Sequence, residues 1–229
     1  MNRTICTAIA ALLLLTDAFP GRGAKAPVTK FPLDSVHGLE TTGGKAEVVT
    51  YRGRKAVRLV PAADRQDSDD SMLSILTTTD FKDGVIEAEI AGSPRPGAPD
   101  DSRGFIGIAF RVQAHDSRYE CFYIRPTNGR ADDQLRRNHS TQYVSEPEYP
   151  WNRLRKESPG VYESYVDLES GAWTKIKIVV TGTHAQLYVN GADQPALVVN
   201  DLKLGETHGP VALWAHSTTD AYFSNLTIK

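Results

Sequence analysis

The sequence has few cysteines, little net charge and no long apolar run, and each of these absences narrows the range of functions. Only two of the 229 residues are cysteines, and one of them, Cys6, lies in the N-terminal leader described below. Cys121 therefore has no partner for an internal disulfide, so the fold depends on a hydrophobic core, which a chain of this length can bury. The formal net charge of −2 gives no indication of a nucleic-acid or anionic-membrane partner. The chain also lacks a cysteine–histidine cluster of the kind that binds zinc.

The N-terminus has the pattern of a secretory signal peptide. One basic residue, Arg3, precedes an uncharged run from Thr4 to Thr16, and small residues and the breaker pair Pro20–Gly21 follow. The run is too short for a membrane-spanning helix, which needs about 20 apolar residues. We therefore expect a signal peptide over residues 1–26, export to the periplasm or the extracellular space, and no membrane insertion after cleavage.

The remaining residues, 27–229, show the pattern of an all-β protein. No long segment has the period of an amphipathic helix; short alternating segments recur instead, with turn residues between them. In "GVIEAEIAG", for example, apolar residues alternate with Glu87 and Glu89, and Asn190–Gly191 is a strong turn pair. No internal repeat, low-complexity tract or linker divides the chain. We expect a single antiparallel jelly-roll sandwich of two sheets.

Seven short segments give this pattern a specific resemblance. In chain order they are "FKDGVIEAEI", "GFIGIAFRV", "YECFYIRP", "WTKIKIVV", "AQLYVNG", "GPVALWA" and "YFSNLTI". From Phe81 to Lys229 the chain resembles the concanavalin A-like lectin/glucanase superfamily, and within it the 3-keto-disaccharide hydrolase-like domains of exported bacterial proteins. The resemblance implies a sandwich that binds a saccharide, but no particular chemistry, because this fold carries lectins, hydrolases and lyases. The Glu-x-Asp-x-Glu strand of retaining glucanases is absent, so we do not expect a glucanase of that type.

Arginine is concentrated in one part of the chain from which lysine is missing. Eight of the sixteen arginines lie between Arg111 and Arg155, and no lysine occurs between Asp83 and Arg155. This bias favours forked guanidinium groups, which bind carboxylates and adjacent sugar hydroxyls, over simple positive charge. The polar segment "RADDQLRRNHSTQYV", from Arg130 to Val144, would form a binding loop on the sheet, with "SEPEYPWNRLRKESPGVYE" as its rim.

Strand alternation assigns these residues to faces of the sheet. Phe110 should point to the core, so Arg111 is expected on the opposite face, together with Tyr123 and Arg125 of the next strand. Aromatic rings suit the apolar face of a sugar, and guanidinium, amide and carboxylate groups suit its hydroxyls. A structural network of arginines and carboxylates is the alternative. The expected substrate-binding residues are Arg111, Tyr123, Arg125, Arg136, Arg137, Gln142, Tyr143, Trp151 and Glu163.

Three residues are candidates for acid–base chemistry. His139 is the side chain best suited to proton transfer near neutral pH, and it lies among short polar residues that could orient it. Glu120 falls on the core face of its strand, where burial would raise the pKa of its carboxyl; pairing with an arginine is the alternative. Tyr165 is a candidate base in a tyrosine-bearing segment, "PGVYESY", that loosely resembles a motif of jelly-roll lyases.

These residues leave three functions open. The family resemblance implies cleavage of a glycosidic bond in a 3-keto disaccharide or oligosaccharide, with His139 or Glu120 removing the proton beside the ketone and arginines holding the enolate. A polysaccharide lyase on a uronic-acid polymer would use Arg125 and Gln142 to neutralise the carboxylate, and His139 or Tyr165 as the base. The third function is carbohydrate binding without catalysis.

No cofactor is firmly implied. A structural calcium ion is common on the superfamily fold, and Asp220 is a potential ligand, but one aspartate is not a metal motif. We expect a monomer whose partner is a saccharide.

Overall fold

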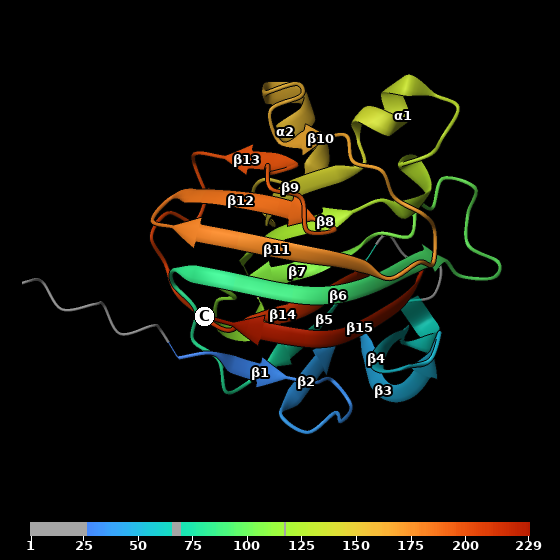
Figure 1. The fold of residues 1–229 in the computed structure, drawn as a ribbon, viewed down its shortest axis with the longest axis vertical. Helices are drawn as coiled ribbons and strands as arrows, with labels where there is room; N and C mark the ends of the chain where they lie inside the picture. The colour runs from blue at the N-terminus through green and yellow to red at the C-terminus, as the bar shows by residue number, and fades with distance from the viewer. Residues whose placement is uncertain (1–26, 66–69, 117) are drawn as a thin grey trace, which may run out of the picture.

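The two sheets of the expected sandwich are present. The computed structural model describes residues 27–65, 70–116 and 118–229; the expected signal peptide over residues 1–26 lies outside them. Within these ranges the strands form two antiparallel sheets that pack face to face (Figure 1). The predicted all-β fold of two antiparallel sheets is therefore confirmed.

The eight-stranded sheet has the order β13-β12-β11-β6-β15-β4-β3, with β1 paired to β15. Ile86 and Ile90 of β6 are buried, whereas Glu87 and Glu89 on the other face form ion pairs with Lys175 and Arg54, so one face of this sheet meets water, as the alternation indicated. The strands are β1 (Thr29–Phe31), β3 (Gly44–Tyr51), β4 (Arg54–Pro61), β6 (Gly84–Pro94), β11 (Thr174–Thr181), β12 (His184–Val189), β13 (Leu197–Val199) and β15 (Thr219–Ile228).

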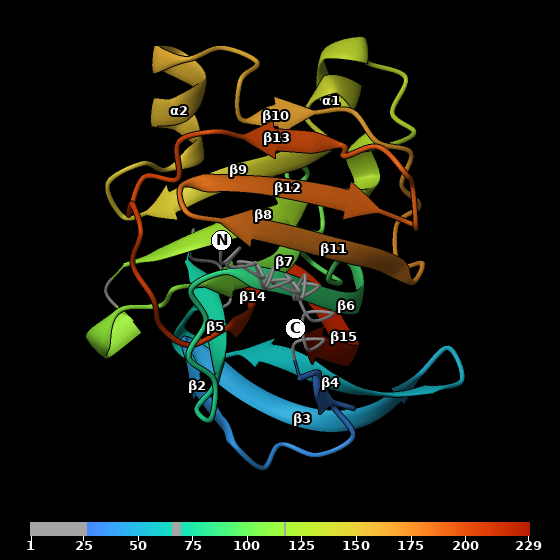
Figure 2. The same cartoon turned by 60° about the vertical axis from the view of Figure 1, so that its left-hand side comes forward.

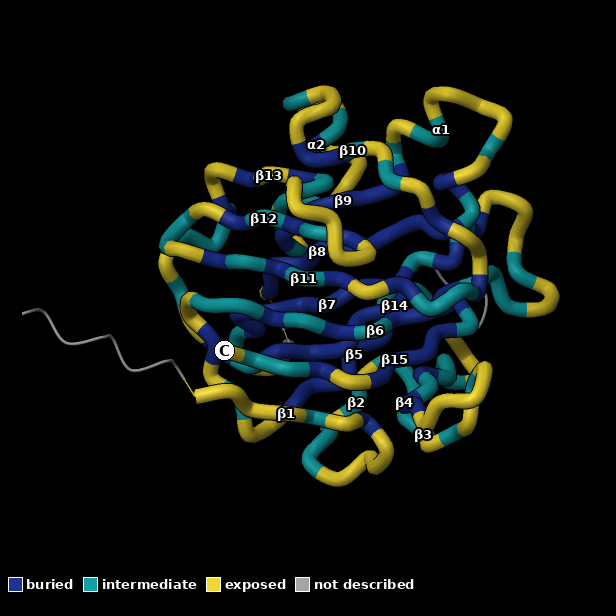
Figure 3. The backbone as a smooth tube through the Cα atoms, in the orientation of Figure 1, coloured by how far each residue is buried: buried dark blue, intermediate teal, exposed yellow. Residues whose placement is uncertain are grey.

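The seven-stranded sheet, with the order β10-β9-β8-β7-β14-β5-β2, is buried on both faces at its centre (Figure 3). Its inner face meets the other sheet. On its outer face Gly107 leaves room for aromatic rings, and a Cβ at Gly107 would collide with the carbonyl oxygen of Phe122. The strands are β2 (Leu39–Thr42), β5 (Ser71–Leu76), β7 (Ile106–Phe110), β8 (Tyr119–Ile124), β9 (Thr141–Glu146), β10 (Glu163–Ser164) and β14 (Ala212–His216).

Two short α-helices stand at one end of the molecule, on either side of β10 (Figures 1 and 2). They are α1 (Gln134–Asn138) and α2 (Trp151–Glu157). Three 3-10 turns cover Ala63–Arg65, Ala114–Asp116 and Pro126–Asn128. None of the helices in the described ranges is long and apolar enough to cross a membrane.

The polar segment 130–144 is not a loop, contrary to the sequence-based expectation. Asp133 caps α1 by accepting a hydrogen bond from the backbone N–H of Arg136 (2.9 Å), and β9 begins at Thr141. The strand was missed because both of its faces carry polar residues, which are nevertheless buried between β8 and β10. The chain thus brings His139 and Gln142 to the edge of the sheet on rigid elements.

Candidate functional site

Arg125 is the centre of a buried polar cluster beside the two helices. Its Nη1 donates to the carbonyl oxygen of His139 (3.0 Å) and to Oε1 of Glu163 (3.1 Å). Its Nη2 donates to the hydroxyl of Tyr123 (3.0 Å) and to Oε1 of Gln142 (2.9 Å). Four acceptors therefore fix the planar fork of one guanidinium group. We call these five residues, together with Arg155, the Arg125 cluster.

Glu163 of β10 links the cluster to both helices. Its carboxylate accepts hydrogen bonds from Nε (2.9 Å) and Nη2 of Arg155 in α2. Its Oε2 lies 3.5 Å from Nε2 of His139, the residue at the C-terminal end of α1. Burial alone would raise the pKa of Glu163, but the hydrogen bonds from Arg155 and the charge of Arg125 outweigh it and lower the pKa. The carboxylate is therefore ionised at neutral pH.

His139 is the group of the cluster suited to proton transfer near neutral pH, and 18% of its side chain is exposed. Burial and the charges of Arg155 and Arg125 lower its pKa and outweigh the attraction of Glu163, so the imidazole is neutral at neutral pH. The separation of 3.5 Å from Glu163 exceeds a hydrogen bond, but such contacts are often long before substrate binds. A proton on Nε2, facing Glu163, leaves the lone pair of Nδ1 free to accept another.

Three predicted residues form a more exposed rim. Trp151 of α2 is 44% exposed, and the guanidinium of Arg155 lies 4.7 Å from its ring centroid. Tyr165, 42% exposed, accepts a hydrogen bond from Nη2 of Arg137 (2.9 Å). The rings of Trp151 and Tyr165 therefore lie at the solvent-exposed edge of the cluster, and each ring lies beside an arginine.

Arg136 and Gln142 support the cluster from within. Nε of Arg136 contacts Oδ1 of Asn128 (3.4 Å), and Asn128 in turn donates to the carbonyl oxygen of His139 (3.1 Å). Gln142 is fully buried and donates from Nε2 to two backbone carbonyl oxygens (2.7 and 3.1 Å) while it accepts from Arg125. Its amide is fully used, so Gln142 positions Arg125 and has no group left for a ligand.

Arg111 does not join the cluster, and its expected position on the outer face is wrong. The chain leaves β7 after Phe110, and Arg111 has φ 54°, which ends the strand alternation on which the expectation rested. Because β7 and β8 are antiparallel, Arg111 lies at the opposite end of the sheet from Arg125. Its fully buried guanidinium donates to the carbonyl oxygens of Lys82, Gly182 and Gly205.

Glu120 and Tyr143 are also separate from the cluster, because both point to the inner face of the sheet. The hydroxyl of Tyr143 donates to Oε2 of Glu120 (2.6 Å), and the backbone N–H of Leu204 donates to Oε1 (2.7 Å). Burial raises the pKa of the Glu120 carboxyl, as expected, and the hydrogen bonds from Tyr143 and Leu204 and the charge of Arg111 offset this in part. The sheet separates both side chains from His139, so neither can act there.

Aromatic rings fill the middle of the outer face, so the expectation that Tyr123 offers a free ring to a sugar is wrong. The ring of Tyr123 stacks on Trp214 with centroids 4.8 Å apart, and Trp214 donates to the hydroxyl of Tyr119 (3.3 Å). All three rings are buried, and burial raises the pKa of Tyr123 to about 12. Tyr123 serves the cluster through its hydroxyl, and the aromatic residues at the surface are those of the rim.

Arg155 and Glu146 are candidates that the sequence analysis missed. Arg155 follows Trp151 by four residues, a spacing that places both on one face of a helix, but α2 itself was not foreseen. Glu146 follows Gln142 by four residues and shares its face of β9. The spacing of Arg155 can be recognised only if a helix is assigned there, and that of Glu146 only if a strand is assigned. The sequence of both segments is instead typical of a polar loop.

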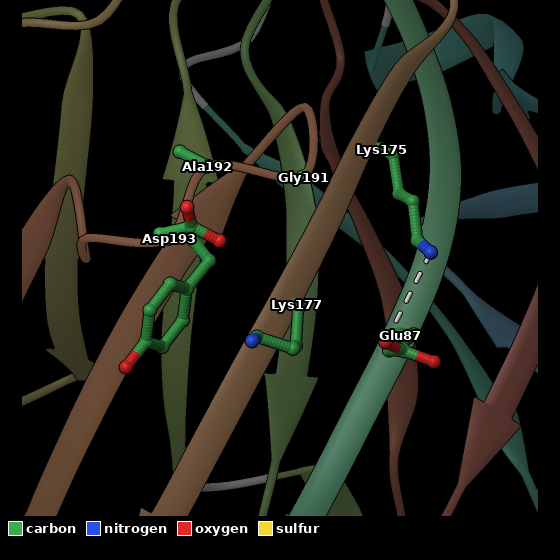
Figure 4. Close-up of a pocket in the computed structure, with 7 residues that line it drawn as sticks. Glu87, Lys175, Lys177, Gly191, Ala192 and Asp193 are labelled. Carbon is green, nitrogen blue, oxygen red and sulfur yellow. Dashed lines mark ion pairs between the residues drawn. The ribbon is translucent and has the colours of Figure 1, made fainter.

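A shallow hollow lies on the outer face of the other sheet, apart from the cluster (Figure 4). Its volume is about 200 Å³. Lys175 lies 4.0 Å from Glu87, and the ammonium of Lys177 lies 3.8 Å from the ring centroid of Tyr188. The hollow is lined by Glu87, Lys175, Lys177, Tyr188, Gly191, Ala192 and Asp193, which include none of the predicted site residues.

The described residues contain no group of three histidine, cysteine or acidic side chains arranged to hold a metal ion. Asp220, the potential calcium ligand, accepts hydrogen bonds from Arg58 (2.9 Å) and Tyr222 (2.8 Å). Its carboxylate is thus part of a surface ion pair on the eight-stranded sheet.

The architecture is that of the concanavalin A-like lectins and glucanases. Similar solved structures include a carbohydrate-binding module from Bacillus subtilis (14% identity, TM-score 0.56, 84% of this chain and 96% of that one). Peanut lectin is similar at 9% identity (TM-score 0.53, 90% and 98%), and the Crh5 transglycosylase in complex with NAG at 12% (TM-score 0.52, 89% and 84%). Identities this low show a shared fold.

The chain belongs to the family of 3-keto-α-glucoside-1,2-lyase-like domains, whose model matches residues 41–229. The match includes every residue of the Arg125 cluster and begins upstream of Phe81, where the recognisable resemblance started. No curated protein sequence matches the chain significantly.

Proposed function

We propose that this protein cleaves the glycosidic bond of a 3-keto disaccharide or oligosaccharide at the Arg125 cluster. The observation that carries the proposal is a neutral, partly exposed imidazole, His139, beside an ionised carboxylate and two guanidinium groups. A base next to fixed positive charge suits removal of a proton from carbon beside a ketone. Membership of a family described by 1,2-lyase chemistry on 3-keto-α-glucosides supports the same reaction class.

In the proposed reaction, Nδ1 of His139 takes the proton from C2 of the 3-keto sugar, and the C–H electrons form an enolate with the C3 ketone. The enolate then expels the oxygen at C1, which forms a C1–C2 double bond. The departing oxygen takes a proton from the His139 imidazolium, so the base is regenerated. The products are an unsaturated 3-keto sugar and the released second sugar.

The charge balance of the cluster fits this intermediate. Arg125 and Arg155 carry two positive charges, and Glu163 carries one negative charge, so one positive charge is left to balance an enolate. Arg125 is 5% exposed and already has four acceptors, whereas Arg155 is 34% exposed. We therefore assign contact with the enolate to Arg155, and the positioning of Glu163 and of the His139 backbone to Arg125.

A uronic-acid lyase is less compatible with these contacts. Such an enzyme needs an amide or guanidinium group free to bind the substrate carboxylate, but Gln142 and Arg125 bind each other and are buried. Carbohydrate binding without catalysis, as in a lectin, is an outcome of the test below.

The test compares His139→Ala with the wild type on a chemically oxidised 3-keto disaccharide. We expect kcat to fall by about 10²–10⁴-fold, the contribution of a general base, while disaccharide affinity measured by calorimetry is retained. His37→Ala, which alters an exposed histidine in the β1–β2 connection, is the matched control and should leave both quantities unchanged. Full activity of His139→Ala would contradict the mechanism; saccharide binding without cleavage by the wild type would indicate a binding domain.

The leader pattern supports a further proposal, that the protein acts outside the cytoplasm. Residues 1–26 lie outside the described ranges, so this rests on the sequence. N-terminal sequencing of protein secreted by an expression host would test it, and a mature chain that still begins at Met1 would contradict it.

A further inference from the structure

Glu146 is a half-buried carboxylate that has no partner among the described residues, and it lies on the same face of the sheet as the Arg125 cluster. It is the last residue of β9, and its side chain points to the outer face with that of Gln142. Among the described residues, no hydrogen-bond donor or cation contacts its carboxylate. Arg118, which precedes the register partner of Glu146 in β8, pairs with Glu148 instead (3.1 Å).

An unpaired carboxylate in this position is costly, and the cost calls for an explanation. Burial, together with the charge of Glu148, raises the pKa of Glu146. Partly buried carboxylates are normally paired, and those that are not gather at functional sites. Glu146 is the register partner of Tyr119, so it lies next to the aromatic rings of the outer face.

The distance between Glu146 and the cluster decides what its carboxylate can do. Four residues of extended strand separate the Cα atoms of Gln142 and Glu146 by about 13 Å. The imidazole of His139 lies beside Glu163, the register partner of Gln142, so this separation also describes how far Glu146 is from the proposed reaction. A group that moves a proton must lie about 3 Å from the reacting atom, so Glu146 cannot act on the bond at His139. The separation is comparable to the length of a disaccharide, and between the two ends the rings of Tyr123, Trp214 and Tyr119 lie buried, so they are not offered as a stacking surface.

We propose that Glu146 binds hydroxyl groups of the second sugar unit, beyond the bond that is cleaved, and thereby makes the protein selective for substrates of at least two sugars. A carboxylate suits this task because its two oxygens accept from adjacent hydroxyls. The inference rests on the proposed function for the position of the cleaved bond. Its binding part stands on the arrangement of Glu146 and the cluster.

The experiment measures kcat and KM on two substrates, a 3-keto disaccharide and the methyl glycoside of the same 3-keto sugar. For Glu146→Ala we expect KM for the disaccharide to rise about tenfold or more, the loss of a hydrogen bond to a charged group, with kcat nearly unchanged. Both constants for the methyl glycoside should stay at wild-type values. Glu146→Gln keeps the side-chain volume and should show the same selective rise in KM for the disaccharide as Glu146→Ala. Glu148→Gln, which alters an exposed neighbour, is the matched control.

An equal effect on both substrates, or no effect on the disaccharide, would overturn the inference. If the wild type cleaves neither substrate, the proposed function fails, and calorimetry with the unoxidised disaccharide and its monosaccharide then tests Glu146 by itself. Weaker disaccharide binding by Glu146→Ala with unchanged monosaccharide binding would support the inference; equal affinities of wild type and variant for the disaccharide would overturn it.

Discussion

The protonation of His139 makes the proposed cleavage depend on pH in a definite direction. A general base must be neutral, and burial and the two nearby arginines lower the pKa of this imidazole below its usual value of about 6.5. We therefore expect kcat/KM to be constant through neutral pH and to fall on acidification, with a midpoint below about 6.5. A pH–rate profile on the 3-keto disaccharide checks this. A midpoint above pH 7 would show that Glu163 stabilises the imidazolium more than the arginines destabilise it.

Glu163 is expected to make the stability of the protein depend on pH. Its side chain is 3% exposed, and the partners Arg125 and Arg155 depress its pKa. A carboxylate whose pKa is depressed by folding stabilises the folded protein at pH values above its unfolded-state pKa of about 4.3. This stabilisation is lost as the pH falls through the folded-state pKa. Glu163→Gln leaves Arg125 buried without its anion, so we expect a loss of about 3–5 kcal/mol at pH 7.

Urea unfolding of wild type and Glu163→Gln, at pH 7 and again near pH 3, measures this contribution. The difference between the two proteins should shrink at the lower pH, because the unfolded wild-type chain takes up a proton at Glu163 before the folded protein does and the wild type loses this stability as the pH falls. A difference that does not change with pH would mean that the glutamate acts through its shape and not through its charge.

At the level of strands, β7 and β8 must approach closely for the outer face to hold its rings. Gly107 pairs with Tyr123 on one side and with Trp214 on the other, and a Cβ there would collide with the carbonyl oxygen of Phe122. We expect Gly107→Ala to destabilise the protein by about 1–3 kcal/mol, as overpacking does, and to disturb the Tyr123–Trp214 stack.

Thermal unfolding and near-ultraviolet circular dichroism test Gly107→Ala together. Gly160→Ala is the comparison, because its φ of 73° makes alanine strained while no atom lies within 4 Å of the added carbon. It should cost about 1 kcal/mol without a change in the aromatic spectrum. Identical spectra for the two variants would show that the ring stack does not depend on the close approach of β7 and β8.

Strand alternation predicted correctly which face of the sheet several residues occupy, and its failures have physical reasons. It placed Phe110 in the core and Tyr123 on the opposite face, because both belong to regular strands between paired neighbours. It failed at Arg111, where a positive φ ends the alternation, and it was not applied to Tyr143, whose strand was not recognised among polar residues. Glu163 was identified by its chemistry, but its partner Arg155 depended on an unforeseen helix.

For the whole molecule, the fold was accessible from sequence because its signal is spread over many short segments, whereas the site is local. Alternation and turn pairs recur along both sheets, so the loss of β9 from the prediction did not change the architecture. The site forms where α1, β9 and α2 lie together, and no repeated sequence pattern predicts that these three elements are adjacent. Position in the sheet separates the two buried arginines: Arg125 lies in the cluster at one end, while Arg111 lies at the other end and links parts of both sheets.

Arg111 is expected to be a determinant of global stability with no part in saccharide binding. It follows β7 of one sheet, and its guanidinium reaches the β11–β12 turn of the other at Gly182 as well as the backbone of Lys82 and Gly205. Removing this buried cation leaves several carbonyl oxygens unpaired, so Arg111→Ala should lose about 3–5 kcal/mol, the cost of breaking a buried charged network. At about 2–4 °C per kcal/mol for a domain of this size, Tm should fall by roughly 6–20 °C.

Arg130→Ala is the control for Arg111→Ala, because its ion pairs with Asp167 and Glu169 are exposed and should leave Tm nearly unchanged. Calorimetry below the unfolding temperature should find wild-type saccharide affinity in both variants, since Arg111 lies at the far end of the sheet from Arg125. A loss of affinity in Arg111→Ala without a loss of Tm would return Arg111 to the binding surface that strand alternation first assigned to it.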